Sequence, residues 1–216
     1  MAYVAVDFDG TLFQGNPLTL MLKVGLTQFP LHRRLRIYKG MSQAAIINYR
    51  KGSYVVRTEL FRAFAQGFRG LTRGEVEAFF VRLVDHGVER LDREVLERIQ
   101  SHHQSGDRVI LLSGALHPFL ELFVARTGAP IDEVRGTELL FEGEICTGEI
   151  GVINHGEEKV RHFQAYLQET EVKETWAYAD SASDLPLFEF VSRPVVVRPK
   201  AEFRTHVEER GWPIIQ

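Results

Sequence analysis

Short runs of apolar residues recur along the 216-residue chain, with longer amphipathic stretches between them. Four runs are uninterrupted, as is typical of parallel strands buried on both faces: residues 3–6, 109–112, 176–179 and 195–197. A weaker fifth run spans residues 131–134. Helical patterns separate the runs, so the sequence predicts an α/β fold, a Rossmann-like parallel sheet with helices on both faces.

The interval between the first two predicted strands is too long for a simple crossover. About a hundred residues lie there, and their pattern is helical throughout. Helix-start signals divide the interval into several helices: Asn16 before Pro17, Ser42, the capping-box pair Thr72 and Glu75, and Asp92. We therefore expect an inserted helical cap domain at residues 14–86 and a core domain formed by residues 1–13 and 87–216. A small β-hairpin is expected at 137–150, where β-favouring residues flank Gly143.

Composition and charge are those of a soluble globular protein. Hydrophobic residues make up 44% and charged residues 25%, which excludes a disordered chain. Twenty-six basic against twenty-nine acidic residues leave a formal net charge of −3, which argues against a nucleic-acid partner and against a chain that binds membrane surfaces through its overall charge. Cys146 is the only cysteine, so an intrachain disulfide is impossible. No apolar run approaches the ~20 residues of a membrane span and no signal-peptide pattern is present, so we expect a cytoplasmic protein. None of these quantities determines the oligomeric state.

The most informative motif is Asp7-Phe8-Asp9-Gly10-Thr11, at the end of the first predicted strand. Side chains two residues apart on a strand share a face, so Asp7 and Asp9 are expected to project together from the carboxyl edge of the sheet. Open α/β sheets bind their ligands at that edge. The simpler alternative is an Asp-Gly turn that carries two solvated carboxylates.

Three more segments place polar groups at strand ends or at a helix start: Ser113-Gly114 after the second strand, Lys159 early in a later helix, and Asp180 with Asp184 after the strand at 176–179. Each has an ordinary interpretation by itself, respectively a loop, a surface lysine and a helix N-cap. Together with Asp7 and Asp9, they occur in the order and setting that one catalytic site requires.

This set of motifs resembles the haloacid dehalogenase superfamily. The resemblance rests on Asp7-x-Asp9-Gly-Thr, Ser113-Gly114, Lys159 and Asp180-x-x-x-Asp184, and it spans nearly the whole chain. The position of the predicted insertion is similar to that of the helical cap in the phosphoserine-phosphatase-like branch, subfamily IB. The resemblance implies a Mg²⁺-dependent phosphatase that acts through an aspartyl-phosphate intermediate on a small or amphipathic organic phosphate.

The resemblance also implies a role for each motif residue. Asp7 is the nucleophile, and Asp9 protonates the leaving group and then activates water. Four residues bind the phosphate: Thr11, Ser113, Gly114 and Lys159. The residues that hold Mg²⁺ are Asp7, Asp9 through its backbone carbonyl, Asp180 and, through a metal-bound water, Asp184.

Two positions in the predicted insertion argue against phosphoserine as the substrate. The phosphoserine enzymes hold the amino acid with a glutamate and an arginine, and a gapless alignment places these positions on Asn16 and Phe64. Arg57, Arg62 or Arg69 could supply the cation if the alignment shifts. The expected partner is therefore a small phosphate ester whose leaving group the sequence does not identify.

A basic run at residues 32–39 stands out in this mildly acidic chain. It is either a solvated helix face or a segment attracted to anionic lipid headgroups or polyphosphates. The second alternative is similar to members of the branch that dephosphorylate phosphatidylglycerophosphate, so membrane-surface contact and a lipid substrate stay open, as does phosphoserine. Two other classes also remain, a phosphotransferase or phosphomutase and a non-catalytic module that binds a phosphate ligand. The last class is expected to have lost a catalytic residue, and none is lost here.

Overall fold

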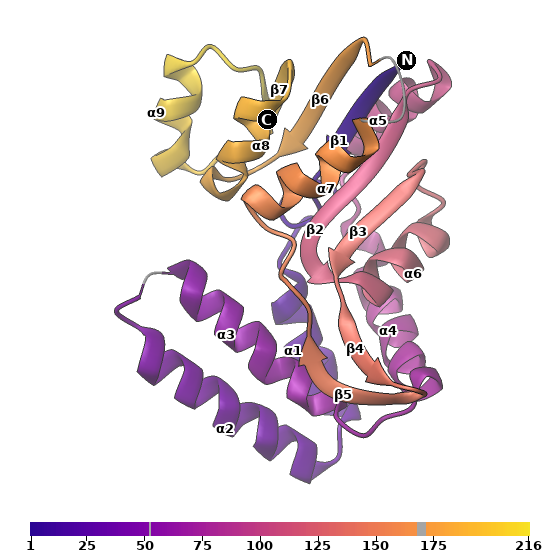
Figure 1. The fold of residues 1–216 in the computed structure, drawn as a ribbon, viewed down its shortest axis with the longest axis vertical. Coiled ribbons are helices and arrows are strands. Elements are labelled where there is room, and N and C mark those ends of the chain that lie inside the picture. Colours follow the sequence, from indigo (N-terminus) through magenta and orange to yellow (C-terminus); the bar gives the residue numbers. More distant parts are fainter. Residues whose placement is uncertain (52, 168–171) are drawn as a thin grey trace.

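Six parallel strands form the main sheet of the computed structural model, which describes residues 1–51, 53–167 and 172–216 (Figure 1). Their order is β3-β2-β1-β6-β7-β8. Their bounds are β1 Ala2–Val6, β2 Arg108–Leu116, β3 Glu133–Thr137, β6 Glu174–Ala179, β7 Arg193–Val197 and β8 Ile214–Ile215. Every neighbouring pair in the sheet runs parallel, which confirms the predicted fold class.

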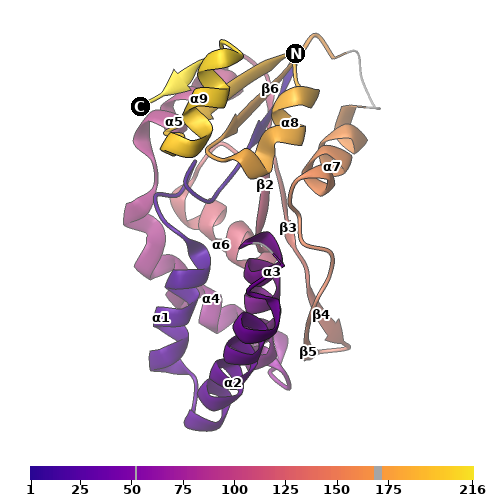
Figure 2. The same ribbon diagram turned by 90° about the vertical axis from the view of Figure 1, so that its left-hand side faces the viewer.

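The central strand β1 is buried on both faces, as its uninterrupted apolar sequence predicts. Val4 and Val6 point into a cluster on one face, and Tyr3 and Ala5 point into a separate cluster on the other. Helices α5 (Arg93–Gln104) and α6 (His117–Thr127) cover the first face. The other face is covered by α7 (Glu157–Leu167), α8 (Leu185–Phe190) and α9 (Ala201–Glu209), as Figure 2 shows.

The first four α-helices after β1 lie beyond the carboxyl ends of the strands, and α5 then leads into β2 (Figure 1). They are α1 (Pro17–Gln28), α2 (Leu31–Asn48), α3 (Ser53–Ala65) and α4 (Arg73–Gly87), with short 3-10 turns at Gln66–Phe68 and Val88–Arg90. Phenylalanines form their shared interior, for example Phe29 stacked on Phe79 with ring centroids 4.9 Å apart. Three of the four predicted caps form as expected: Asn16 accepts from Thr19 N, Thr72 and Glu75 make a capping box, and Asp92 accepts from Val95 N.

Two of the predicted element boundaries are wrong. Ser42 does not start a helix, because α2 begins at Leu31 after Pro30 and continues through Ser42. The strand predicted at 131–134 is β3 at Glu133–Thr137. Asp132 closes the turn before that strand, since its backbone N–H donates to Val109 O at 2.8 Å and its carboxylate accepts from Val109 N at 2.7 Å.

The predicted hairpin is present as β4 (Leu139–Glu142) and β5 (Ile145–Ile150), which pair antiparallel. Gly143 turns the chain with φ +58°, a conformation that favours glycine. The hairpin packs on the helical insertion, because Cys146 N donates to Leu71 O at 2.8 Å and Gly70 N donates to Cys146 O at 2.8 Å. Among the described residues, no helix is both long enough and apolar enough to cross a membrane.

The two chain segments that lead into and out of the insertion lie side by side. Gln14 N donates to Arg90 O at 2.7 Å, and Asp92 N donates to Leu12 O at 2.9 Å. The buried carboxylate of Asp92 also accepts from Gln14 Nε2 at 2.9 Å and from Arg198. The Asp92 carboxylate therefore links the two segments to each other, and also to the start of α5 and to Arg198, which follows β7.

Candidate active site

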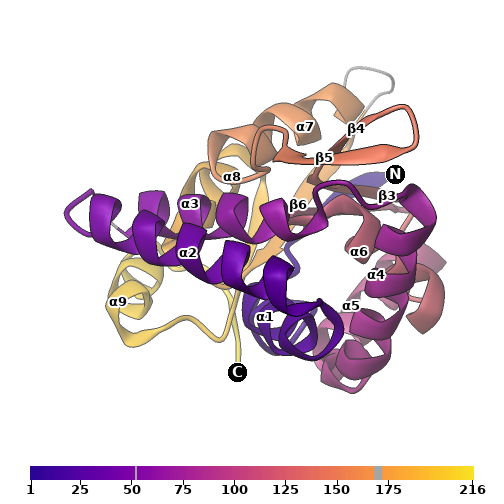
Figure 3. The same ribbon diagram turned by 90° about the horizontal axis from the view of Figure 1, so that it is seen from below.

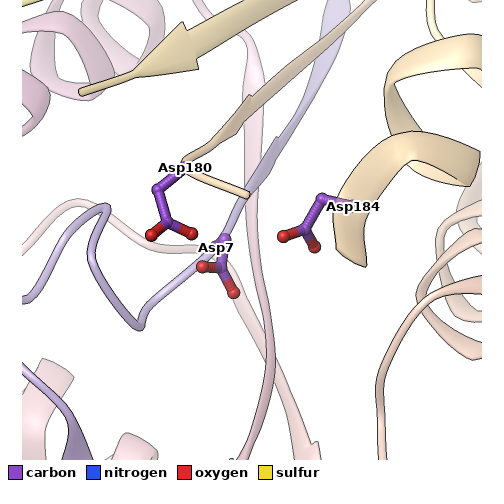
Figure 4. Close-up of side chains that lie close together, drawn as sticks. All are labelled: Asp7, Asp180 and Asp184. Carbon is purple, nitrogen blue, oxygen red and sulfur yellow. The ribbon is translucent and has the colours of Figure 1, made fainter. Parts of the chain in front are cut away.

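Three aspartates meet at the carboxyl edge of the sheet. Asp7 follows β1 and Asp180 follows β6, and these strands are neighbours with Val6 paired to Tyr178. Asp184 ends the 3-10 turn Ala182–Asp184 that comes next. Carboxylate oxygens of Asp7, Asp180 and Asp184 lie within 4.8 Å of one another, and Figure 4 shows the three side chains converging.

A buried lysine lies against this cluster. Lys159, in the first turn of α7, is 2% exposed. Its Nζ donates to Asp7 Oδ1 at 2.6 Å and also to Asp184 Oδ1. Burial by itself lowers the pKa of the ammonium, but Asp184 and Asp7 outweigh this effect and raise the pKa of Lys159 above its usual value. The lysine is therefore a fixed positive charge within the site.

One ammonium does not neutralise three carboxylates. Burial, opposed by Lys159, raises the pKa of Asp7 well above its usual value. Burial together with the neighbouring Asp184 raises the pKa of Asp180 to about 6. The cluster therefore has a deficit of positive charge that protons or a metal cation can fill.

The donor set fits a hard divalent cation such as Mg²⁺, which prefers carboxylate and carbonyl oxygens. The loop after β1 is shaped to lie against these ligands. A Cβ at residue 10 would lie 2.3 Å from Asp180 Oδ2, so Gly10, at φ +79°, provides the space for that carboxylate. Asp7, Asp180 and Asp184 are thus the described residues that could hold a metal.

We expect Mg²⁺ to stabilise the protein against heat, and to do so more at pH 7 than at pH 5. Asp180 and Asp7 have raised pKa values, so the metal-free folded state binds more protons than the unfolded chain. The stabilisation that these bound protons give the folded state is complete below pH ~4 and is lost as pH rises through about 6. Above that pH a cation can take the place of the protons and restore stability. Thermal unfolding with Mg²⁺ or EDTA at both pH values measures this.

Asp180→Asn is the test variant, and Asp85→Asn, an exposed change on α4, is its matched control. We expect Asp180→Asn to reduce the Mg²⁺-induced rise in melting temperature and Asp85→Asn to preserve it. An equal Mg²⁺ effect at both pH values, or one that persists in Asp180→Asn, would contradict metal binding at this cluster.

Asp9 faces the insertion rather than the three-aspartate cluster. It pairs with Arg57 from α3, while its Oδ1 is buried without a hydrogen-bond partner. Burial, partly offset by Arg57, raises the pKa of Asp9 to about 6. Its carboxyl group can therefore both donate and accept a proton near neutral pH.

A cavity of about 460 Å³ opens between the sheet edge and the insertion. Six of the residues singled out by the sequence line it: Asp7, Asp9, Gly114, Lys159, Asp180 and Asp184. Thr11 and Ser113 do not line it and are fully buried. The hydroxyl of Thr11 makes a long contact of 3.4 Å to Asp7 Oδ2, and Ser113 Oγ accepts from Ala115 N at 3.0 Å.

The position of Ser113 and Gly114 differs in one respect from the prediction. They lie within β2, which continues to Leu116, rather than after its end. The pairing of β2 with β3 is interrupted between Leu112 and Leu116, so this part of the strand is irregular. Thr137 Oγ1 donates to Gly114 O at 2.8 Å and fixes the irregular segment.

Three cationic or titratable residues of the cavity were not assigned a role by the sequence: Arg57, His155 and Lys200. Arg57 was only a possible substitute in a shifted alignment, and nothing in the local sequence links it to Asp9. Lys200 follows β7 at the same sheet edge, so the rule that located Asp180 could have located it. Phe64, aligned with the cap arginine, is buried among phenylalanines and does not line the cavity.

The chain is similar to known proteins in sequence and in fold. A histidinol-phosphatase of Neisseria meningitidis is 31% identical over 128 residues, which cover 54% of this chain and 55% of that protein. The chain spans about half the length of the curated relatives it matches. A Bordetella pertussis protein of unknown function superposes over 100% of this chain and 98% of its own, with TM-score 0.81 and 18% identity.

A probable phosphoserine phosphatase from Vibrio cholerae superposes with TM-score 0.73 and 15% identity, over 99% of this chain and 60% of its own. At such identities the two superpositions show a shared fold. The family model of haloacid dehalogenase-like hydrolases matches residues 4–189. Because this match covers most of the sequence, the chain belongs to the haloacid dehalogenase-like hydrolases, and its fold is similar to that of phosphoserine phosphatases.

Proposed function

We propose that the protein is a Mg²⁺-dependent phosphomonoesterase that forms a phosphoryl intermediate on Asp7. The observation that carries the proposal is the convergence of Asp7, Lys159, Asp180 and Asp184 at one sheet edge, with Asp9 lining the same cavity. A bound Mg²⁺ would supply positive charge that draws a phosphate dianion towards the carboxylates and stabilises the transferring group. The residues 14–86 then serve as a cap over the cavity.

In the first step a carboxylate oxygen of Asp7 attacks phosphorus, and the bond from phosphorus to the leaving oxygen breaks. Lys159 holds Asp7 at 2.6 Å, so the nucleophile is fixed before substrate binds. The same ammonium, with the N–H groups near Thr11 and Gly114, is placed to stabilise charge on the transferred phosphoryl group.

Asp9 is the proton donor and acceptor in the proposed reaction. Protonated Asp9 gives its proton to the leaving alkoxide, and the resulting carboxylate then removes a proton from the water that attacks the phosphoryl–Asp7 bond. The products are an alcohol and inorganic phosphate, and Asp7 is restored. A pKa of about 6 allows Asp9 to play both parts near neutral pH.

Among the described residues of the insertion, Arg57 brings a positive charge to the catalytic edge of the sheet through its ion pair with Asp9. Arg57 and Phe61 on α3 and Asn16 before α1 line the same cavity, so the leaving group meets both polar and apolar surface. We propose a small organic phosphate as substrate. The histidinol-phosphatase and phosphoserine phosphatase relatives make their two substrates the first to test.

Phosphate release from a panel of esters tests this proposal: p-nitrophenyl phosphate, histidinol phosphate, phosphoserine, sugar phosphates and phosphatidylglycerophosphate. We expect turnover with Mg²⁺ and none with EDTA. Arg57→Ala should lower kcat/KM for the preferred ester about tenfold or more, because it removes the cation facing Asp9 and the cavity. Arg62→Ala, which removes an exposed arginine from the same helix, should change it less than about twofold. Equal effects of the two variants, or turnover in EDTA, would contradict the proposal.

A further inference from the structure

The outer face of α2 exposes large apolar side chains to solvent. Six of the eleven exposed large hydrophobic residues among the described ones lie between positions 31 and 49: Leu31, Leu35, Tyr38, Ile46, Ile47 and Tyr49. Their exposed fractions run from 47% to 72%, whereas scattered single exposures are the usual condition of a protein surface. This concentration on one helix calls for a specific explanation.

Helical geometry arranges most of these residues into a single line. Leu31, Leu35, Tyr38, Ile46 and Tyr49 are spaced by three or four residues, or by two such steps across Ser42, so they share one side of α2. We call these five residues the outer stripe. The residues that directly follow these five in the sequence form a second line beside the outer stripe: His32, Arg36, Lys39, Ile47 and Arg50. The outer stripe therefore runs beside a mainly cationic edge.

The opposite side of α2 is used for packing within the protein. Ile37 is buried, and a Cβ at residue 40 would lie 3.2 Å from Ala63 Cβ, so α2 packs closely on α3 there. In Figures 1 and 3 the two helices run side by side, and Figure 1 shows α2 farther from the sheet. The outer stripe thus faces away from the rest of the described chain.

The charge of this region is strongly one-sided. Residues 10–58 contain eight lysines and arginines and no aspartate or glutamate. The rest of the chain carries eighteen basic and twenty-nine acidic residues. Arg33 and Arg34 are held by backbone carbonyls, Arg33 at Gly67 and Arg69 and Arg34 at Phe29. Arg36 and Lys39 are exposed beside the stripe, and Arg50 stacks on Tyr49 at 5.2 Å.

We infer that the outer stripe of α2 binds the surface of an anionic lipid bilayer. A helix with an apolar line bordered by cations lies in the plane of such a surface, with its apolar side chains at the acyl boundary and its cations at the anionic headgroups. No aspartate or glutamate at positions 10–58, which include all of α2, opposes this attraction. Tyr49 presents an amphipathic ring of the kind favoured at the membrane–water interface.

Two other occupants fit the observations less well. A second copy of the chain packed stripe to stripe would bring cations against cations, with no acidic residue on α2 to pair with them. A nucleic acid would satisfy the cations but leave leucine and isoleucine side chains facing phosphates and water. Only a surface that is both anionic and apolar satisfies the whole face.

Flotation of the full chain with lipid vesicles tests the inference. We expect binding to vesicles of equal parts phosphatidylglycerol and phosphatidylcholine, and none to phosphatidylcholine alone. Arg36→Glu should weaken binding about tenfold or more, because it replaces attraction to the headgroups by repulsion. Leu35→Ser should weaken it about tenfold by removing apolar area from the interface.

The matched control is Arg93→Glu, an equal charge reversal at an exposed position at the start of α5, far along the chain from α2. It should leave vesicle binding within about twofold, because Arg93 lies on α5, outside both the outer stripe and the cationic edge of α2. Unchanged thermal unfolding of each variant shows that the fold is retained. Equal binding to both vesicle types, equal effects of Arg36→Glu and Arg93→Glu, or a dimer that Leu35→Ser dissociates would overturn the inference.

Discussion

Replacing Asp7 by asparagine is expected to lower kcat for phosphate release at least about 10⁴-fold. An amide oxygen is a far weaker nucleophile towards phosphorus than a carboxylate, and the other carboxylate that Lys159 contacts, Asp184, comes from the turn after β6 rather than from the end of β1. The folded state should be preserved, because burial already raises the pKa of Asp7 and thus disfavours its ionised form. Steady-state phosphate release with Mg²⁺ at pH 7 measures the loss.

The control for this prediction is Asp85→Asn, which makes the same chemical change at the exposed partner of Arg126. Its kcat should stay within about twofold of the parent chain, since a surface ion pair contributes little. If Asp7→Asn keeps more than about a hundredth of the parent rate, Asp7 is not the nucleophile, and a water molecule must attack the ester directly.

Asp92→Ala is expected to cost the fold about 3 kcal/mol, the largest stability effect that we expect from a residue outside the cavity. The buried carboxylate accepts from Val95 N at 3.0 Å, from Gln14 Nε2 at 2.9 Å and from Arg198. Alanine removes the cap of α5 and leaves two donors without their acceptor. Urea unfolding at equilibrium gives the free energy.

Two further substitutions separate the causes of that loss. Asp92→Asn retains a capping oxygen but not the charge, so its free energy of unfolding should lie between that of the parent chain and that of Asp92→Ala. Glu94→Ala, two positions after Asp92, removes an exposed carboxylate that pairs with Arg98, and it should cost less than about 1 kcal/mol. A loss in Asp92→Ala no greater than that in Glu94→Ala would show that the junction does not depend on Asp92.

Local chemistry made much of this fold predictable from the sequence. The apolar run of β1 and the capping residues Asn16, Thr72 and Asp92 can be recognised from neighbouring residues alone, and the strand and the caps form as expected. The helix start predicted at Ser42 was wrong because serine also occurs inside helices, and α2 begins earlier, after Pro30. The strand β3 was displaced because the side chain of Asp132 bonds to Val109, a contact with no local signature.

The candidate site also has a part that could be predicted from the sequence and a part that could not. The proximity of Asp7, Asp180 and Asp184 could be predicted from the sequence because parallel strands end at one edge of a sheet. The pairing of Arg57 with Asp9 could not, because it depends on how α3 packs over that edge. We therefore expect specificity to depend on the insertion, the part of the chain where sequence patterns say least about geometry.

A covalent phosphoryl group on Asp7 is the central claim, and trapping it is the most direct test. Asp9→Asn should retain attack on p-nitrophenyl phosphate, whose leaving group needs no proton, but should slow attack by water. After incubation with Mg²⁺ and an acid quench, mass spectrometry should find one phosphoryl group on the peptide that contains Asp7. No phosphopeptide despite release of p-nitrophenol, or a phosphoryl group on another residue, would contradict the claim.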